Sequence, residues 1–299
     1  MKITRRDFLK ASAAIAGALV LKTSGLMQLQ KAMAAEGGQP VIWLQGQGCT
    51  GCSVSLLNSV FNTTIDDLLI NTLDLKFHPT VMAAAGDLAA EAAENARTAG
   101  GYVLVIEGAI PDGANGNYCH IWPGMTMLDA LGSFAPDAIA ILAVGTCACY
   151  GGLSAGSPNP TGAKGVEDIL GSGTAINISG CPPHPDWIVG TVAMLLNGEM
   201  PELDTYGRPK GIFQNTVHDI CPNNANYLQG RKAKVLSEAG CLERLGCRGL
   251  ETHADCPIRQ WNSSGSGKLG VNWCIGARNP CQGCTEPNFP DGMSPFYSL

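Results

Sequence analysis

The sequence predicts an α/β fold in which a parallel β-sheet is covered by helices on both faces. Short apolar runs rich in β-branched residues recur between residues 41 and 178, and segments of helical character separate them. Continuous apolar runs are typical of strands that are buried on both faces of a sheet. We therefore expect a doubly wound, flavodoxin-like domain over residues 35–205. The alternation stops near Tyr206, so residues 206–299 are expected to form a second, loop-rich domain with little regular structure.

The expected elements follow one another along the first domain. Strands are indicated by short apolar runs over 41–44, 73–77, 102–106, 138–144 and 175–178. Helices are indicated by the segments over 53–61, 87–97, 165–170 and 185–196. The second of these helices is rich in alanine, the residue with the highest helix propensity.

The second domain combines little apolar periodicity with many cysteines. It holds seven of the thirteen cysteines, few β-branched runs and many Gly, Pro and Asn residues. Such a segment has too little apolar surface to fold by burial alone. Metal–ligand bonds commonly replace a hydrophobic core in segments of this kind. The composition therefore favours a metal-stabilised domain.

The amino terminus has the pattern of an export signal. An Arg-Arg pair precedes an apolar run over residues 11–21, and small residues follow up to Ala34. This order predicts a twin-arginine signal peptide over residues 1–34, with cleavage after Ala34. The alternative is a membrane-anchoring helix. The apolar run is too short for such a helix, because Lys22 ends it before it reaches the ~20 residues that a membrane span requires.

The charge of the mature chain argues against a nucleic-acid partner. Loss of residues 1–34 removes six basic groups and one acidic group, so the net charge falls from −6 to −11. An acidic protein is repelled by phosphate backbones. No later stretch is long and apolar enough to cross a bilayer, so no transmembrane segment is expected in the mature chain. We therefore expect a soluble periplasmic protein.

Four cysteines are expected to meet at one edge of the sheet. The loop over 46–51 satisfies G-x-G-x-x-G directly after the first strand, which by itself indicates a dinucleotide site. Cys49 and Cys52 lie in and beside that loop, however, and Cys147 and Cys181 each follow a later strand. Since the carboxyl ends of parallel strands converge on one crevice, the four thiols should meet there. Four thiols around one point favour a [4Fe–4S] cluster or a zinc ion over a dinucleotide.

Eight further residues form two more groups of four. The second group is His218, Cys221, Cys241 and Cys247, and the third group is Cys256, Cys274, Cys281 and Cys284. His218 is included because the three cysteines that follow it need a fourth ligand. Cys119 and Cys149 are left over and are expected to be buried as small apolar side chains.

Three kinds of chemistry remain open for these groups. Zinc is possible for any single group, and disulfides are common in exported proteins. The odd number of cysteines disfavours disulfides, and so does twin-arginine export, which carries proteins that are already folded. Three iron–sulfur clusters in series would pass single electrons from one to the next. The cysteine pattern therefore favours an electron-transfer protein.

The motifs that carry these residues resemble those of the small subunit of periplasmic [NiFe] hydrogenases, over nearly the whole mature length. The matching motifs are Cys49-Thr50-Gly51-Cys52, Val105-Ile106-Glu107-Gly108, Gly145-Thr146-Cys147-Ala148, Gly180-Cys181-Pro182-Pro183, His218-x-x-Cys221 and Asn279-Pro280-Cys281-Gln282-Gly283-Cys284-Thr285-Glu286-Pro287-Asn288-Phe289. The resemblance implies that the first group holds a cluster proximal to the metal site of a large subunit. It implies a distal cluster near the surface at the second group, and a middle cluster at Cys256, Cys281 and Cys284.

Two departures from the common family pattern point to a subclass. The common family has proline where this chain has Cys274, and glutamate where it has Gly48. A fourth thiolate at position 274 implies a full [4Fe–4S] middle cluster, and hence three [4Fe–4S] clusters in all. Both departures, and the segment 52–58, resemble the selenium-containing [NiFeSe] subclass.

The resemblance implies an electron-relay small subunit of a heterodimeric uptake hydrogenase, which catalyses H₂ ⇌ 2H⁺ + 2e⁻. Electrons would pass between the Ni–Fe site of a large subunit, which contains selenocysteine in this subclass, and a periplasmic c-type cytochrome. No catalytic side chain is expected in this chain, and Glu107 is expected to have a structural hydrogen-bonding role. The alternative is a stand-alone, multi-cluster ferredoxin-like carrier.

Two sets of surface candidates accompany this function. Arg231, Lys232 and Lys234 lie between ligands of the second group and either form a solvated helix face or dock the electron carrier. Three tryptophans are candidates for the interface with the large subunit or for core packing: Trp43, Trp122 and Trp187.

Overall fold

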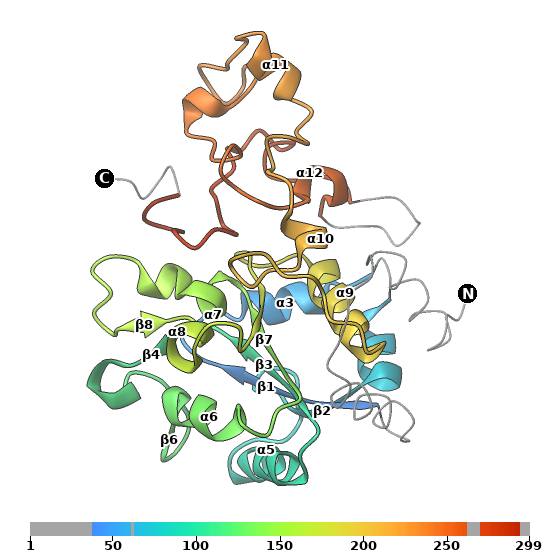
Figure 1. Ribbon diagram of the computed structural model, residues 1–299, viewed down its shortest axis with the longest axis vertical. Helices are drawn as coiled ribbons and strands as arrows, with labels where there is room; N and C mark the ends of the chain where they lie inside the picture. Colours follow the sequence, from blue (N-terminus) through green and yellow to red (C-terminus); the bar gives the residue numbers. More distant parts are fainter. Residues whose placement is uncertain (1–37, 61–62, 262–269, 294–299) are drawn as a thin grey trace.

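A computed structural model describes residues 38–60, 63–261 and 270–293, and its central feature is a five-stranded parallel sheet (Figure 1). The strands are β1 (Gln39–Gln45), β2 (Leu73–Phe77), β3 (Val103–Glu107), β7 (Ala140–Val144) and β9 (Ile176–Ile178). They lie in the order β2-β1-β3-β7-β9, which corresponds to the flavodoxin-like order 2-1-3-4-5. The expected fold class is confirmed. The expected signal peptide over residues 1–34 lies outside the described residues.

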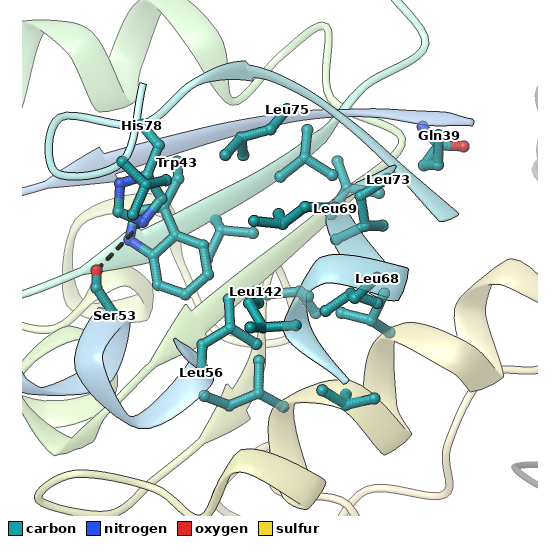
Figure 2. A pocket seen from close by; sticks show the side chains of 18 of the residues that line it. Gln39, Trp43, Ser53, Leu56, Leu68, Leu69, Leu73, Leu75, His78 and Leu142 are labelled. Carbon is teal, nitrogen blue, oxygen red and sulfur yellow. Dashed lines mark hydrogen bonds between the residues drawn. The ribbon is translucent and has the colours of Figure 1, made fainter. Parts of the chain in front are cut away.

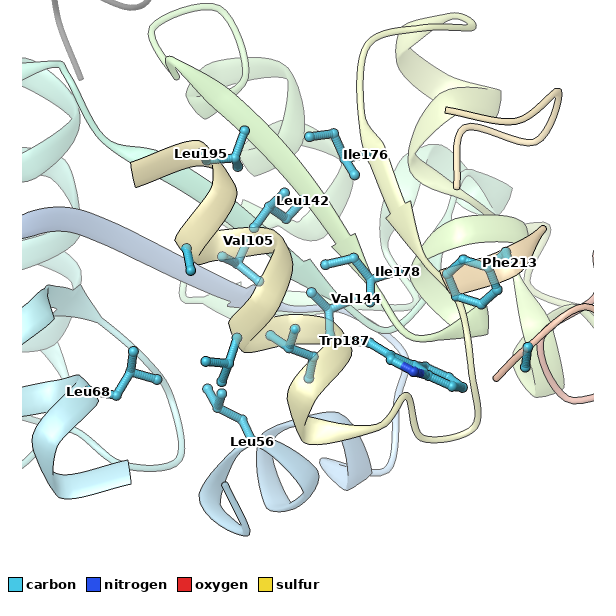
Figure 3. Packing of buried hydrophobic residues seen from close by; sticks show 14 of the residues in the cluster. Leu56, Leu68, Val105, Leu142, Val144, Ile176, Ile178, Trp187, Leu195 and Phe213 are labelled. Carbon is cyan, nitrogen blue, oxygen red and sulfur yellow. The ribbon is translucent and has the colours of Figure 1, made fainter. Parts of the chain in front are cut away.

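Helices cover both faces of this sheet. They are α3 (Gly51–Leu57), α5 (Asp87–Ala99), α6 (Met127–Phe134) and α9 (Pro185–Leu196). Successive strand residues point to opposite faces, so Trp43 and Val105 join one apolar cluster with α3 and α9 (Figure 3). Ile42 and Leu104 join a second cluster with α5 and α6. This arrangement explains why the strands are continuous apolar runs in the sequence.

The remaining elements of the first domain are short. They are α4 (Ile65–Asp67), the π-helix η1 (Leu68–Thr72), β4 (Ile110–Pro111), η2 (Gly113–Gly116), β5 (His120–Trp122), β6 (Met125–Thr126), α7 (Thr146–Tyr150), η3 (Gly152–Ala155), β8 (Ala163–Lys164) and α8 (Val166–Leu170). β4 pairs with β8 and β5 with β6, in both cases antiparallel.

The sequence prediction missed α6, which connects β3 to β7 together with the small strands. The helix has recognisable signals: Thr126 accepts a hydrogen bond from the Asp129 N–H as its N-cap, and apolar residues recur at helical spacing through Phe134. The expected helix over 53–61 is also shorter than expected, because α3 ends at Leu57.

The packing on the α3 and α9 side leaves a void of about 30 Å³ (Figure 2). Apolar side chains such as Leu56, Leu68 and Leu142 surround it, with Ser53 and His78 at one end. Ligand pockets commonly measure ~300–1,000 Å³. The void is therefore a packing defect of the core and too small for a cofactor.

The C-terminal region after residue 205 has little regular structure, as expected. Its helices are α10 (Lys210–Phe213), α11 (Asn224–Leu228), η4 (Glu243–Leu245) and α12 (Cys256–Arg259). Strand pairing among its described residues is limited to isolated bridges such as Lys232 with Cys241. Figure 1 shows α11 at the end of the molecule farthest from the sheet.

The three tryptophan candidates lie in or against the core of the chain. The exposed fractions of Trp43 and Trp187 are 3% and 1%. Trp122 is half-buried and contacts Phe77 and Phe134 edge-on. Of the two interpretations, core packing is correct for Trp43 and Trp187, because their side chains are already buried within this chain.

A buried ion-pair network surrounds Arg208, close to the expected boundary at residue 205. Arg208 has an exposed fraction of 1%, and its guanidinium donates to Asp204 Oδ2 at 2.8 Å, to Glu286 Oε1 at 3.0 Å and to Thr285 O at 3.2 Å. Glu286 Oε1 also accepts the backbone N–H of His253 at 2.6 Å. Glu286 therefore links Arg208, on the chain segment after α9, to the distant segment around His253.

We predict that Arg208→Met lowers the free energy of unfolding by about 3–5 kcal/mol, because it leaves the buried Glu286 carboxylate without its cation. Urea unfolding of the purified protein, followed by circular dichroism, measures this change. The double variant Arg208→Met/Glu286→Gln should recover part of the loss, since the uncompensated charge is gone.

The matched control is Lys210→Met, which breaks the exposed ion pair between Lys210 and Glu202. Exposed pairs contribute about 0–1 kcal/mol, so this variant should unfold close to the wild-type protein. An equal loss in Lys210→Met and Arg208→Met would contradict a role for burial in the network.

Candidate metal centres

The first cysteine group lies where three strands of the sheet end. Cys49 follows β1, Cys147 follows β7 and Cys181 follows β9, while Cys52 lies in the first turn of α3. The strand between β1 and β7 is β3, and it ends at Glu107. The topology therefore brings a carboxylate and four thiols to the same edge of the sheet, as the convergence of parallel strands predicts.

Electrostatic coupling shows that the four thiols of this group are neighbours. Burial raises the pKa of Cys52 well above its usual value, and the charges of Glu107, Cys147, Cys181 and Cys49 raise it further. Burial, followed by Cys147 and Cys49, raises the pKa of Cys181 to about 11. Four thiolates at these positions repel one another, so a bound cationic centre is required to keep them all ionised.

Glycines create the space around these sulfurs. A Cβ atom on Gly145 would lie 2.4 Å from Cys52 Sγ, and one on Gly152 would lie 2.9 Å from Cys147 Sγ. Gly145 has φ of 91° and Gly152 has φ of 50°, conformations that glycine adopts without strain. Glycine at these two positions therefore leaves the room that the sulfurs of Cys52 and Cys147 occupy.

Glu107 accepts hydrogen bonds from five donors next to this group. Trp43 Nε1 and Gln45 Nε2 each donate to Oε2 at 2.9 Å, and the Ser53 hydroxyl donates to the same oxygen. The backbone N–H groups of Cys52 and Ser53 donate to Oε1 at 3.0 and 3.2 Å. The carboxylate is thus satisfied while buried. The expected structural hydrogen-bonding role of Glu107 is confirmed.

The Ser53 hydroxyl extends this network to His78 (Figure 2). His78 Nδ1 accepts the Thr80 N–H at 3.1 Å, so its Nε2 carries the proton and donates to Ser53 Oγ at 3.2 Å. Burial lowers the pKa of His78 to about 4, although Glu107 opposes the shift. The imidazole is therefore neutral near pH 7.

The third group lines one cavity. The cavity has a volume of about 340 Å³, and Cys256, Cys274, Cys281 and Cys284 all contribute to its wall. Burial raises the pKa of Cys256 well above its usual value, and the other three cysteines and Asp255 raise it further. The four thiols therefore lie around the same cavity.

Three cysteines of the second group are also neighbours. Burial raises the pKa of Cys221, and so do Cys247 and Cys241. The backbone N–H of His218 donates to Gly249 O at 2.8 Å, which places His218 beside the segment that carries Cys247. The His218 ring meets Tyr227 edge-on, with 4.5 Å between the ring centroids. His218 is therefore near the group, and its imidazole contacts an aromatic ring.

The thirteen cysteines are all free in the structure, so the disulfide alternative is wrong for this fold. Cys149 is buried in the core, where its thiol donates to Ala143 O at 3.3 Å, as expected for a small apolar side chain. Cys119 is half-buried against the same apolar cluster.

Within the described residues, no three His, Cys, Asp or Glu side chains are placed to share a single metal ion.

The basic candidates lie on a loop and not on a helix. Arg231 and Lys234 are exposed, and Lys232 Nζ forms an ion pair with Glu243 Oε2 at 2.9 Å. Lys232 also lies over the Tyr227 ring, 4.7 Å from its centroid. The expected helix face is thus wrong, because α11 ends at Leu228.

Two residues near the thiols were not singled out from the sequence. Thr146 is buried and hydrogen-bonds to segments that carry ligands of two groups, and Ser53 connects Glu107 to His78. Thr146 stands in a motif, Gly145-Thr146-Cys147, but its partners are far away in the sequence.

The described helices include none with the length and apolar character needed to cross a bilayer.

Comparisons with known proteins agree with this organisation. Residues 49–195 match the family described as NADH ubiquinone oxidoreductase, 20 Kd subunit, and residues 213–297 match the C-terminal family of the NiFe/NiFeSe hydrogenase small subunit. Residues 2–22 match the twin-arginine translocation signal sequence. The export signal and periplasmic location expected from the sequence are thereby supported.

Individual relatives cover almost the whole chain. It is 41% identical to the periplasmic [NiFeSe] hydrogenase small subunit of Desulfomicrobium baculatum, over 99% of both chains. It is 40% identical to the periplasmic [NiFe] hydrogenase small subunit 1 of Nitratidesulfovibrio vulgaris, over 99% of this chain and 93% of the relative.

Solved structures give the same result. The [NiFeSe] hydrogenase from Desulfovibrio vulgaris Hildenborough in the oxidized state matches with a TM-score of 0.81 and 46% identity, over 88% of this chain and 98% of the other. The reduced, active Ni-Fe-Se hydrogenase from Desulfomicrobium baculatum matches with a TM-score of 0.81 and 42% identity, over 87% and 98%. The chain belongs to the family of periplasmic NiFe/NiFeSe hydrogenase small subunits, which act on H₂ in a heterodimer with a large subunit.

Proposed function

We propose that this chain carries electrons through three [4Fe–4S] clusters between the Ni–Fe site of its large subunit and an external carrier. The observation that supports this most directly is the sorting of twelve candidate ligands into three neighbouring groups. The first group lies at the edge of the sheet and includes the exposed Cys49. The second group lies near α11, at the far end of the molecule (Figure 1). When bound, each cluster would accept and release one electron at a time.

The donor sets fit clusters better than single zinc ions. A zinc ion with Zn–S bonds of about 2.3 Å holds its sulfurs roughly 3.8 Å apart. No three described ligand-type side chains share such a point, although the thiols of each group are electrostatically coupled. A cubane has four iron corners that each take one thiolate, and a group of four coupled thiols supplies that number.

Contacts between the groups support their order along the relay. Cys181 of the first group also lines the cavity of the third group. Cys281 of the third group donates its backbone N–H to Cys247 Sγ of the second group at 3.3 Å. The third group therefore lies between the other two, which agrees with proximal, middle and distal roles for the first, third and second groups.

The thiol of Cys274 supports a four-iron middle cluster and the [NiFeSe] subclass. It lines the same cavity as the other three cysteines of the third group, and it contributes to the raised pKa of Cys256. In this proposal the large-subunit partner contains selenocysteine.

The surface around the second group suits a redox partner. Leu228, Val235 and Leu236 have exposed fractions of 77%, 56% and 52%, and they lie beside exposed Arg231 and Lys234. Transient electron-transfer interfaces are small and combine apolar contacts with a polar rim. In this proposal the carrier is a periplasmic c-type cytochrome that docks here.

Metal analysis of the purified native complex tests the main proposal. We expect about twelve iron atoms per small subunit, from three clusters of four, with nickel and selenium in the partner. A stand-alone carrier would contain iron without nickel. A colourless preparation without iron would refute the cluster assignment.

Replacing Cys274 by proline should convert the middle cluster to a three-iron form, because one iron corner loses its thiolate. Electron paramagnetic resonance of the oxidised complex should then show a three-iron signal that the wild type lacks. Cys119→Ser is the control, since this thiol lies in no ligand group, and it should leave the spectrum unchanged. The same signal in the wild type would rule out Cys274 as a ligand.

Neutralising the docking surface with Arg231→Gln, Lys232→Gln and Lys234→Gln should slow cytochrome reduction by several-fold at low salt and flatten its salt dependence. The control has the same charge change elsewhere: Lys76→Gln, Lys164→Gln and Lys210→Gln, each in an ion pair outside the segment that carries the docking surface. Stopped-flow reduction of the cytochrome measures both. Equal rates in the two triple variants would exclude docking at this surface.

A further inference from the structure

Thr146 occupies the junction between the first and third cysteine groups. It is the first residue of α7, directly after β7, and it precedes Cys147 of the first group. Its exposed fraction is 1%, and the side chain lies between the sheet and the segment that carries the third group. The hydroxyl therefore has only protein groups as hydrogen-bond partners within reach.

The Thr146 hydroxyl makes two hydrogen bonds, one to a segment of the first group and one to a segment of the third group. It accepts the backbone N–H of Gly180 at 2.9 Å, and Gly180 precedes Cys181 of the first group. It donates its own proton to the backbone carbonyl of Cys284, a member of the third group. One side chain thus contacts segments that carry ligands of both groups, and both its donor and its acceptor capacity are used.

The backbone of Cys181 also lies close to the thiol of Cys284. Burial raises the pKa of the Cys284 thiol to about 12, and a hydrogen bond from the backbone of Cys181 opposes this rise. Cys181 also lines the cavity of the third group. The segments around positions 181 and 284 are therefore joined both through the Thr146 hydroxyl and directly from backbone to sulfur. These contacts define a short, hydrogen-bonded connection between the segments that carry the two groups.

We propose that Thr146 is a positioning residue of the electron relay, whose hydroxyl holds the first and third groups at a fixed separation and completes a hydrogen-bonded route between them. This inference rests on the proposed function. Clusters held by the cysteines of the first and third groups would exchange one electron, so that the donor cluster would be oxidised by one electron and the acceptor cluster reduced by one. No proton is transferred and no covalent bond forms or breaks.

Two alternatives to this role differ in what they predict. A purely structural threonine would support folding but would not affect communication between the groups. A residue that is dispensable would leave both unchanged. Variants of the hydroxyl distinguish the proposed role from both alternatives. Thr146→Val keeps the shape of the side chain but removes both hydrogen bonds, whereas Thr146→Ser keeps the hydroxyl.

The experiment compares Thr146→Val, Thr146→Ser and the control Thr191→Val in the native complex. Thr191 is equally buried, but its hydroxyl donates to Trp187 O within its own helix. Three quantities are measured: iron per complex, the magnetic interaction between the clusters by electron paramagnetic resonance, and H₂-dependent reduction of a one-electron dye relative to D₂/H⁺ exchange. The exchange reaction reports on the large subunit without the relay.

We expect Thr146→Val to weaken the magnetic interaction and to lower dye reduction several-fold relative to exchange, with Thr146→Ser and Thr191→Val close to the wild type. If Thr146→Val does not accumulate, Thr146→Ala removes the same hydroxyl without adding a methyl group in its place and is compared in the same way. Wild-type coupling and a wild-type ratio of dye reduction to exchange in the variant without the hydroxyl overturn the inference. So does an equal loss in Thr146→Ser.

The outcome is separable from that of the proposed function. Absence of iron or of H₂-dependent dye reduction in the wild-type complex would refute the relay itself. If the wild-type complex contains iron and is active, and Thr146→Val behaves like the wild type in all three measurements, only the role of Thr146 is refuted.

Discussion

The burial of thiols in close groups is the constraint on which this structure depends. Burial and neighbouring cysteines raise the pKa values of Cys52, Cys181 and Cys256 together, so their groups cannot ionise fully unless a cation compensates the charge. The second domain has few regular elements and is built around two such groups. Bound metal would therefore provide both the electron carriers and much of the stability of this domain.

The first domain provides the rigid side of this arrangement. The parallel sheet brings three strand ends together, and glycines beside the sulfurs leave space that any Cβ atom would fill. Glu107, at the end of the central strand, is satisfied by five donors and fixes the start of α3 through the backbone of Cys52 and Ser53. The same edge then meets the second domain through the Arg208 network and through Thr146. The fold thereby brings ligand residues that are far apart in the sequence next to one another.

Much of the fold could be predicted from local pattern. The strand over 73–77 and the helix over 185–196 coincide with β2 and α9 at both ends, because apolar runs and helical segments are local properties. α6 was missed although it carries an N-cap and an apolar face. The tryptophans were ambiguous because a large apolar side chain suits a core and an interface equally well. Burial within this chain decides for Trp43 and Trp187.

The sequence by itself determined the chemistry of the candidate sites: the number of thiols, the short spacing of C-x-x-C pairs and the separation of an α/β domain from a cysteine-rich one. Only the tertiary structure decided which groups are adjacent, that Cys281 contacts Cys247, and that Thr146 contacts Cys284 across 138 positions. The physical reason is that ligand type and backbone preference are properties of short segments. Hydrogen bonds between such segments exist only after the chain has folded and excluded water from them.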